Sequence, residues 1–567
     1  MSYKNFTTAL YCPVHVLNSI GDLKSFDESF KFIEKHIDVN KVYLETHRSG
    51  EMISREKMLS IKKYFEKKGI KTSGGITTSV SSEFSGFISF CYTNLEQRKK
   101  LKEIVEFTAS IFDEIILDDF YFTNCKCADC IEAKGDRSWP EFRTELMRQV
   151  SEEIILEPAR RVNPKVSMII KYPNWYDCYQ ETGYNLADEP NMFDMIYTGT
   201  ETRDPLYTQQ HLPGYLGYFI MRYLENVKPG KNGGGWFDIF ECSGNPASYT
   251  QQAQLTLFGK AKEVTLFNMG SLLKEYSAFT PVVGYEFSTL DRILDKLGKP
   301  RGTACYIPYH SSGENYLHAY IGTMGIPLEP FPTIPEGNGT LFLTQSAACD
   351  EQIIDKIHQK LLAGSKVVVT SGFVKATQGR GFERLANIRC TDRKAYVDRY
   401  IYSLNGGVAF GGTADASKRI IIPQLEYATN DTWQLAAALG EDNNFPVLLM
   451  LRYGKGQLYV LTVPDDCGDI YNYPPMVLGI IRNAVAGDLP VRIDAPSRVA
   501  LFVYDNDTFI VRSGLPGAET VHIIIDRANA SIVNLATGQA YTGSTQNGKT
   551  LISVALMPSE YKAFQIK

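Results

Sequence analysis

Three features that would point to particular partners are missing from this 567-residue sequence. It has no excess of charge of one sign, because 59 lysines and arginines face 64 acids and the net charge is −5; we therefore expect no nucleic-acid partner and no anionic membrane partner. No window approaches the apolar length that spans a bilayer. The first residues, MSYKNFTTALYCPVHV, lack a basic segment followed by a long apolar run, so we expect no signal peptide.

The sequence also lacks the regular cysteine spacing of a disulfide framework. Its eleven cysteines are odd in number and mostly scattered, which is typical of a reducing compartment. We expect a cytoplasmic protein, or a periplasmic one if a leader has been removed. The glycine-rich stretch GGVAFGG at 406–412 lacks the strand-turn-helix context of a phosphate loop, so we expect no nucleotide site there.

The composition that is present is that of an ordinary globular protein, with 44% apolar and 22% charged residues. Residues 1–298 alternate short apolar strands with helices whose apolar residues recur three and four positions apart. Eight strands in this length predict a (β/α)8 TIM barrel, rather than the competing doubly wound open sheet. The predicted strands lie near Leu10 and at 41–45, 70–76, 114–119, 166–172, 193–199, 235–241 and 263–269.

Two smaller domains are expected after this barrel. The segment LGKPRG at 297–302 is interpreted as a linker. Strands at 339–345 and 366–372, with the helix DEQIIDKIHQKLLAG between them, indicate a flavodoxin-like α/β domain over 299–490. From 491 to 567 short alternating strands and turn residues predict a small β-sandwich.

Acidic residues stand at the predicted ends of two barrel strands. Asp118 and Asp119 end the fourth, and Glu241 ends the seventh. Acids at the carboxyl ends of barrel strands are typical of catalysis, and two facing carboxyl groups suit glycosidic cleavage. Capping of helices or binding of a metal is the alternative, and it is weaker for Glu241 because the apolar run WFDIF before it brings its side chain to the active face. Because consecutive strand residues point to opposite sides, at most one of the two aspartates should face the pocket squarely.

Polar and aromatic side chains at the same strand ends are candidates for binding a sugar. Tyr (33) and Phe (30) are plentiful, which suits flat sugar rings as well as cores. The candidates for substrate contact are Glu45, Lys171, Trp175, Glu201, Arg203 and Trp236.

Four cysteines have the spacing of a metal site. Cys125, Cys127 and Cys130 form C-x-C-x-x-C in the loop after strand four, and Cys91 leaves the neighbouring strand three. Four thiolates close a tetrahedral site with no position left for water, so the zinc would be structural rather than catalytic. Reduced, metal-free thiols are the alternative.

The order of these residues resembles that of the glycoside hydrolase family 42 β-galactosidases. In that family a cysteine after strand three and a C-x-C-x-x-C after strand four bind zinc, strand four ends in Asn-Glu, and strand seven ends in the glutamate nucleophile. The resemblance implies that Glu241 is the nucleophile and that Asp119 stands where the acid/base glutamate would be, with Asp118 in place of the asparagine. It also implies a middle domain that builds a homotrimer.

These observations predict a retaining, exo-acting β-glycosidase acting on a carbohydrate substrate. Two alternatives remain open. In one, an aspartate of strand four is the nucleophile and Glu241 or Glu201 is the acid. In the other, the replacement of Asn-Glu by Asp-Asp has left a carbohydrate-binding pseudoenzyme. If both aspartates ionise, their repulsion should raise one pKa and so favour a general acid.

Overall fold

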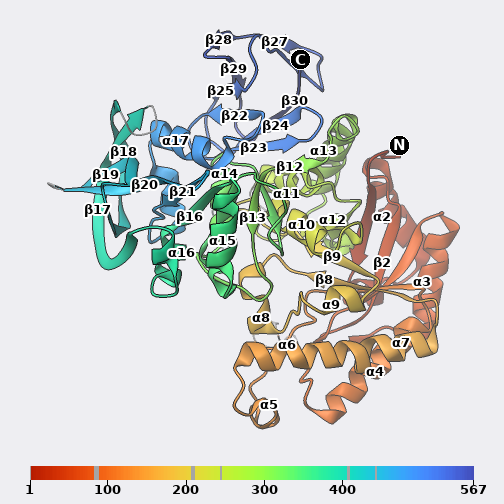
Figure 1. Cartoon of the computed structure of the whole chain (residues 1–567). Helices are drawn as coiled ribbons and strands as arrows, with labels where there is room; N and C mark the ends of the chain where they lie inside the picture. Colours follow the sequence, from red (N-terminus) through yellow and green to blue (C-terminus); the bar gives the residue numbers. More distant parts are fainter. Residues whose placement is uncertain (1, 82–87, 206–210, 243–244, 405–408, 441–442) are drawn as a thin grey trace. The chain divides into compact units, whose positions relative to one another are not determined.

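The N-terminal half of the chain is a closed barrel of eight parallel strands (Figure 1). The computed structural model describes residues 2–81, 88–205, 211–242, 245–404, 409–440 and 443–567. The strands pair in the order β1-β2-β4-β7-β8-β9-β10-β11, and β11 pairs with β1. This confirms the predicted TIM barrel. The strands are β1 Thr7–Cys12, β2 Lys41–Arg48, β4 Lys71–Ile76, β7 Glu114–Leu117, β8 Ser167–Tyr172, β9 Met195–Gly199, β10 Asn232–Asp238 and β11 Glu263–Phe267.

Helices connect the strands and lie outside the barrel (Figure 1). Local sequence sets where several of them begin: Asp22 accepts two backbone N–H groups at the start of α2, and Ser138 and Glu141 form a capping box at the start of α6. The principal helices are α2 Leu23–His36, α3 Arg55–Lys67, α4 Leu95–Ala109, α5 Ala128–Lys134, α6 Trp139–Val150, α7 Glu157–Val162, α10 Leu216–Val227, α11 Pro246–Phe258 and α13 Phe279–Leu294.

Strand alternation fills the barrel interior and then presents polar groups at its carboxyl end. Buried aromatic and aliphatic residues, among them Tyr43, Ile169 and Trp236, form one interior cluster. Residues two apart on a strand share a face. Lys171 therefore follows Ile169 on the inner face, and Asp238 follows Trp236 in the same way.

Two strand ends differ from the predictions. The fourth barrel strand, β7, ends at Leu117, so Asp118 and Asp119 lie in the loop that follows. The seventh, β10, ends at Asp238, and Glu241 lies three residues further on with a φ of 55°. Because neither acid group is held in a ladder, strand alternation does not decide where Asp119 and Glu241 point.

Residues Asp295–Lys567 form a second compact unit with its own sheets. Its largest sheet has the parallel order β14-β13-β15-β16-β21, the doubly wound arrangement of flavodoxin-like folds. These strands are β13 Thr303–Tyr306, β14 Leu328–Phe331, β15 Leu341–Leu343, β16 Lys366–Thr370 and β21 Gly456–Leu461. Helices α14 Leu317–Thr323, α15 Ile353–Leu362, α16 Ser371–Thr377 and α17 Pro475–Ala486 accompany them.

An antiparallel extension of this sheet was not predicted. Its strands are β17 Ile388–Leu404, β18 Ala409–Tyr427, β19 Thr432–Gly440 and β20 Asn443–Tyr453, and β20 pairs with β21. Part of the glycine-rich stretch 406–412 lies outside the described residues.

The C-terminal segment forms two antiparallel sheets around a shared apolar core, as predicted for a β-sandwich. Their orders are β12-β23-β24-β30-β26-β27 and β22-β25-β29-β28. The short strand β12, Pro300–Arg301, pairs with β23, so the predicted linker contributes a strand to this sheet. The others are β22 Val491–Asp494, β23 Val499–Tyr504, β24 Thr508–Ser513, β25 Glu519–Ile525, β26 Ile532–Asn534, β27 Ala540–Tyr541, β28 Ser544–Gln546, β29 Lys549–Leu556 and β30 Tyr561–Ile566.

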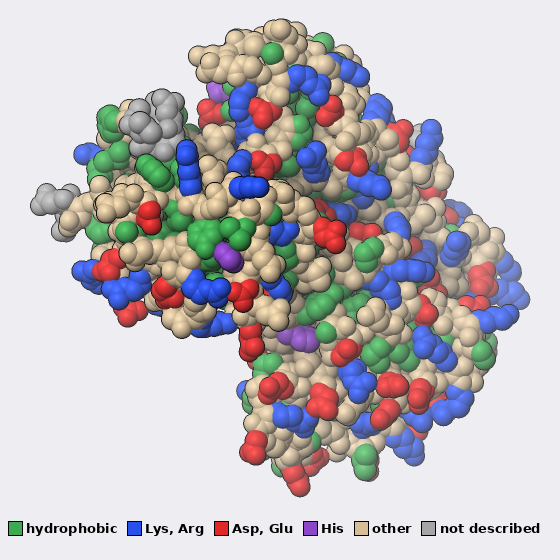
Figure 2. All heavy atoms as spheres, viewed as in Figure 1, with side chains coloured by type: hydrophobic (Ala, Val, Ile, Leu, Met, Phe, Trp, Pro, Cys, Tyr) green, Lys and Arg blue, Asp and Glu red, His purple; other side chains and the backbone are tan. Residues whose placement is uncertain are grey.

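The visible surface carries both signs of charge, with lysine and arginine side chains interspersed among acids (Figure 2). Within the described ranges, no helix has the length and apolar character required to cross a membrane.

Candidate active site and metal centre

A buried lysine links three carboxylates at the carboxyl end of the barrel. Lys171 Nζ donates to Asp119 Oδ2 at 2.7 Å and to Glu201 Oε1 at 2.6 Å, and it lies 3.4 Å from Asp118 Oδ1. The ammonium also lies 4.2 Å from the centre of the Trp236 ring. Burial opposes the charge of Lys171, but the three carboxylates outweigh burial and raise its pKa. Lys171 therefore stays charged and holds the carboxylates together.

A second cation, the partly buried Arg48, ties the end of β2 to the loop after β7. Arg48 Nη2 donates to Asp118 Oδ2 at 2.7 Å, and its Nε donates to both oxygens of Glu45 at 3.0 and 3.1 Å. Glu45 is fully buried and also accepts hydrogen bonds from Tyr11, Thr77 and the backbone N–H of Val14. With its oxygens occupied in this way, Glu45 positions Arg48.

The two consecutive aspartates have different environments. The Asp118 side chain is 3% exposed, whereas that of Asp119 is 16% exposed. Burial opposes ionisation of Asp118, but Lys171 and Arg48 outweigh it and hold its pKa at about 2. Burial, together with the charges of Asp118 and Glu201, raises the pKa of Asp119 to about 8 against the attraction of Lys171. At neutral pH the more accessible carboxyl group is therefore the one that carries a proton.

Glu201, two residues after β9, lies close to Asp119 because both contact Lys171. The two distances to Nζ limit the separation of Glu201 Oε1 and Asp119 Oδ2 to at most about 5.3 Å. Burial raises the pKa of Glu201. Its other oxygen, Oε2, lies against Gly199, where an added Cβ would stand only 2.5 Å away. Both oxygens of Glu201 therefore face groups of the barrel wall.

Glu241 lies in a more open position, beside Arg203. The Arg203 guanidinium forms a two-pronged ion pair with Asp238, at 3.1 and 2.9 Å, and its Nη1 lies 3.7 Å from Glu241 Oε2. The Glu241 side chain is 35% exposed. Asp238 and Glu241 raise the pKa of Arg203 against the effect of burial, so the cation next to Glu241 is permanent.

The predicted aromatic contacts occupy different depths. Trp236 is buried in the barrel interior, 4.4 Å from the ring of Tyr11. Trp175 is half-buried and packs edge-on against Phe122 at 5.9 Å. Phe240, adjacent to Glu241, is exposed and lies 5.9 Å from Phe267, whose face also meets Arg48 at 5.5 Å.

Sequence reasoning missed Arg48, Thr77 and Asp238. Arg48 is separated from Asp118 by 70 positions, so no local sequence pattern predicts the ion pair between them. A signal for Asp238 was available, because it stands two residues after the inward-facing Trp236. The role of each predicted site residue in catalysis stays a prediction.

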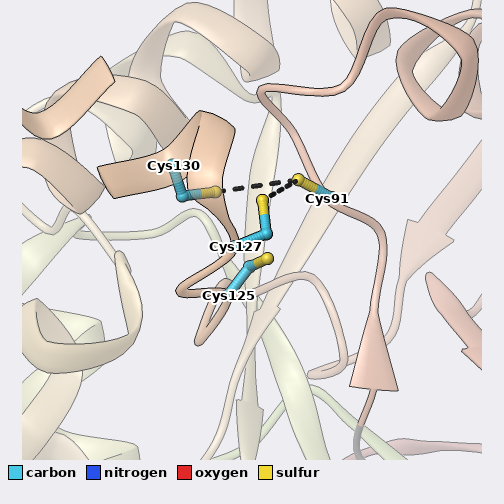
Figure 3. Close-up of side chains that lie close together, drawn as sticks. All are labelled: Cys91, Cys125, Cys127 and Cys130. Carbon is cyan, nitrogen blue, oxygen red and sulfur yellow. Dashed lines mark hydrogen bonds between the residues drawn. The ribbon is translucent and has the colours of Figure 1, made fainter. Parts of the chain in front are cut away.

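The four predicted metal ligands come together, with their sulfur atoms pointing toward one another (Figure 3). Cys91 comes from the segment before α4, and the other three come from the loop and the first turn of α5. All four Sγ atoms lie within 4.8 Å of one another. Cys91 Sγ is 3.7 Å from both Cys127 Sγ and Cys130 Sγ.

These distances fit a tetrahedral thiolate site. Zn–S bonds of about 2.3 Å in a tetrahedron place the sulfurs about 3.8 Å apart. The backbone N–H of Cys130 lowers the pKa of Cys127 to about 7, which favours one thiolate. The Thr93 hydroxyl lies 3.2 Å from the sulfurs of both Cys91 and Cys130, where it can support further thiolate charge. The donor set therefore fits a soft divalent ion such as zinc.

Comparison with known proteins identifies the family. Residues 1–290 match the family model described as "Probable glycosyl hydrolase, catalytic domain". The chain belongs to this family. Residues 490–566 match "Probable glycosyl hydrolase, C-terminal domain", and 297–466 match the second domain of the uncharacterized protein SSO3021. This chain is thus a glycoside hydrolase with a barrel catalytic domain.

Among sequence relatives, the uncharacterized protein SSO3021 of Saccharolobus solfataricus is 27% identical over 565 residues, covering 90% of each chain. The fold is similar to that of α-L-fucosidase isoenzyme 2 from Paenibacillus thiaminolyticus, with a TM-score of 0.68, 11% identity and coverage of 99% and 100% of the two chains. It is also similar to a β-galactosidase from Bacillus circulans sp. alkalophilus, with a TM-score of 0.63, 12% identity and coverage of 99% and 98%. These likenesses extend over the whole three-part fold.

Proposed function

We propose that this glycoside hydrolase is a retaining, exo-acting β-glycosidase with Asp119 as acid/base and Glu241 as nucleophile. The observation that carries the proposal is the environment of Asp119, a partly exposed carboxyl group with a pKa raised to about 8 at the carboxyl end of the barrel. A general acid must be protonated and must reach the leaving oxygen. Among the barrel's acids, Asp119 combines both properties.

In the first step Asp119 donates its proton to the glycosidic oxygen while a Glu241 oxygen attacks the anomeric carbon. The bond to the leaving group breaks, and a covalent glycosyl-enzyme forms. Arg203 Nη1 lies 3.7 Å from Glu241 Oε2, where it can orient the attacking carboxylate. In the second step Asp119 takes a proton from water, the water oxygen attacks the anomeric carbon, and Glu241 is released as a carboxylate.

Lys171, Arg48 and Asp118 support Asp119 without needing to touch the substrate. The Asp118 carboxylate is held by Arg48, Thr77 and Lys171 and accepts the backbone N–H of Asp119 at 2.8 Å. Its fixed negative charge disfavours ionisation of Asp119. One buried aspartate thus keeps its neighbour protonated.

A second candidate mechanism makes Asp119 the nucleophile and Glu201 the acid. The observation in its favour is that their oxygens lie at most about 5.3 Å apart, which is below the ~6.5–9.5 Å gap of inverting enzymes. The raised pKa of Glu201 also suits an acid. Against it stands the accessibility of the site, since both Glu201 oxygens face the wall.

Variants at three residues, assayed on a panel of aryl glycosides, separate these mechanisms. With Asp119 as acid/base, Asp119→Asn lowers kcat/KM by roughly 10²–10⁴-fold for substrates with poor leaving groups. It spares kcat/KM for dinitrophenyl glycosides, whose leaving group needs no acid. Glu241→Gln should lose activity on all substrates of the panel. Azide should restore turnover of Glu241→Ala, and the product should be the glycosyl azide of opposite configuration. Glu201→Gln should keep most of the rate.

Loss of every substrate in Asp119→Asn, with azide rescue of Asp119→Ala to the glycosyl azide of opposite configuration, would establish the second mechanism instead. If wild type turns over no glycoside but calorimetry shows sugar binding, the chain is a carbohydrate-binding pseudoenzyme and the proposal fails.

We also propose a structural zinc ion held by Cys91, Cys125, Cys127 and Cys130. The mutual approach of the four sulfurs supports it. A closed tetrathiolate has no open position for substrate or water, so the ion would fix the loop after β7 and take no part in bond cleavage. Metal analysis of the purified protein should give one zinc per chain; a value near zero would contradict this.

The homotrimer and the cytoplasmic location remain proposals as well. The relation to the family 42 enzymes supports the first, and the eleven free cysteines support the second. Light scattering that gives the mass of a monomer, 63.6 kDa, would refute the trimer.

A further inference from the structure

A buried arginine beside the cysteine cluster has no ion-pair partner of its own. Arg143, on α6, is 5% exposed. Its Nη1 donates to the backbone oxygen of Glu181, while Nε and Nη2 are buried without a hydrogen-bond partner among the described residues. Within that part of the chain no carboxylate is paired with it. A buried charge is costly unless another charge compensates it.

The cysteine cluster is a further source of negative charge near Arg143, besides the Glu181 carboxylate. Burial lowers the pKa of Arg143, whereas Glu181, Cys130 and Cys125 act in the opposite direction. Contacts agree with this proximity: the Arg143 guanidinium lies 4.7 Å from the centre of the Trp139 ring, and Lys126, which stands between Cys125 and Cys127, lies 5.6 Å from the same ring. Arg143 and the metal-binding loop therefore border one aromatic side chain.

We propose that Arg143 is the counter-cation of the cysteine cluster and stabilises its thiolates when they hold a divalent metal ion. Four thiolates and one divalent ion carry a net charge of −2. Arg143 offsets part of that charge from a position out of solvent, where electrostatic attraction is strongest. Lys126 and Lys134, each 5.6 Å from the Trp139 ring centre, add positive charge nearer the surface.

This inference rests on the proposed zinc centre and explains why the arginine is buried. Without metal, four protonated thiols would carry no charge to offset the buried guanidinium, and Glu181 would be its main compensating charge. With metal, cluster and arginine form a charge-compensated pair. Groups around the ligands of a metal site commonly change its affinity by 10–100-fold, so Arg143 acts as a positioning residue for the metal loop.

The test compares Arg143→Met, which keeps an unbranched stem and removes the charge, with Arg143→Lys, which keeps the charge. Arg148→Met is the matched control, because Arg148 lies on the same helix but is 41% exposed and pairs with Glu152 at 3.5 Å. The readouts are the rate of zinc release to a coloured chelator and the thiolate-to-metal absorption of the cobalt-substituted protein, with circular dichroism to monitor folding.

We expect Arg143→Met to release zinc at least about 10-fold faster than wild type, Arg143→Lys to release it at a rate between the two, and Arg148→Met to be unchanged. Release from Arg143→Met at the wild-type rate would overturn the inference. If Arg143→Met does not fold, Arg143→Lys decides: zinc loss as complete as in Cys127→Ser would show that shape, not charge, matters. A wild-type chain that binds no zinc overturns this inference and leaves the glycosidase proposal intact.

Discussion

Two clusters of ionisable side chains, the carboxylates around Lys171 and the four cysteines, lie at the carboxyl end of the barrel strands. They differ in how their negative charge is compensated. The carboxylates around Lys171 are matched by cations of the chain itself, Lys171, Arg48 and Arg203, through contacts of 2.6–3.7 Å. Among the described residues, no ion pair involves the four cysteines. The buried cation that we assign to them is Arg143. The first cluster is organised without any added group, whereas the second would be charge-balanced by the divalent metal ion that we propose for it. The carboxylate cluster fits catalysis, because Asp119 can give up and regain a proton near neutral pH. The cysteine cluster fits a structural role.

We expect the largest loss of activity from a substitution of Glu241, the most accessible carboxylate of the site. Glu241→Gln should lower kcat on an aryl glycoside by at least roughly 10³-fold, since an amide cannot form the glycosyl-enzyme. Initial rates of wild type and variant check this. The control is Glu157→Gln on α7, an exposed acid remote from the cluster, which should keep the wild-type rate; a fully active Glu241→Gln would refute the assigned nucleophile.

Removal of the shared cation should come next. Lys171→Met leaves Asp119 and Glu201 without their common partner, so kcat/KM should fall by roughly 10²-fold, while Lys171→Arg keeps the charge and loses less. Without the cation the carboxyl pKa values rise, and the descending limb of the pH profile should move to higher pH. A pH–rate profile of each variant measures the shift, and an unmoved limb would contradict the role given to Lys171.

The pH dependence of wild-type kcat/KM tests whether Asp119, unlike Asp118, is protonated at neutral pH. With Asp119 at a pKa of about 8, kcat/KM should be level at neutrality and fall up to tenfold per pH unit above about pH 8, because the general acid is lost. Rates measured from pH 5 to 10 test this. A descending limb at pH 5 would mean that Asp119 is ionised at neutrality and cannot be the acid.

Metal removal should affect stability and leave the chemistry of the folded enzyme unchanged. A chelator that strips zinc should lower the Tm of the barrel by a few degrees, corresponding to about 1–2 kcal/mol, and kcat per folded molecule should stay within about twofold. Calorimetry and rate assays on the same sample give both values. A loss of kcat that matches the zinc released, without unfolding, would place the metal in the reaction.

A further effect is expected on stability between pH 4 and pH 8. The folded state holds a proton on Asp119 up to about pH 8, whereas the unfolded chain releases it near pH 4, so this group costs stability as pH rises across that interval. Asp119→Asn removes the cost, and its Tm relative to wild type should increase from pH 4 to 8. A constant Tm difference over this range would show that the Asp119 pKa is not raised.

Much of the barrel and of the metal centre could be predicted from local patterns. Apolar strands alternating with amphipathic helices define the eight-stranded barrel, and C-x-C-x-x-C with one further cysteine defines a tetrahedral ligand set. The site itself was predicted only in part, since the acids come from strand ends but their partners come from elsewhere. Arg48 and Lys171 contact Asp118 across 70 and 53 positions, and only the closed barrel brings them together.

Strand ends were the least predictable feature of the site. The run WFDIFE is apolar enough to continue β10 to Glu241, yet the strand ends at Asp238, which pairs with Arg203. The antiparallel extension β17–β20 was likewise missed, because long hairpins carry no helix spacing and their register depends on the neighbouring strand. Both cases show tertiary pairing overriding local sequence.

The central claim is that Glu241, rather than Asp119, forms the covalent intermediate. Trapping with a 2-deoxy-2-fluoro aryl glycoside, followed by mass spectrometry of the labelled peptide, tests it most directly. We predict that the label is found on Glu241 and that Glu241→Gln takes up none. A label on Asp119 would contradict the assignment and make Asp119 the nucleophile, and a label on neither residue would remove both from that role.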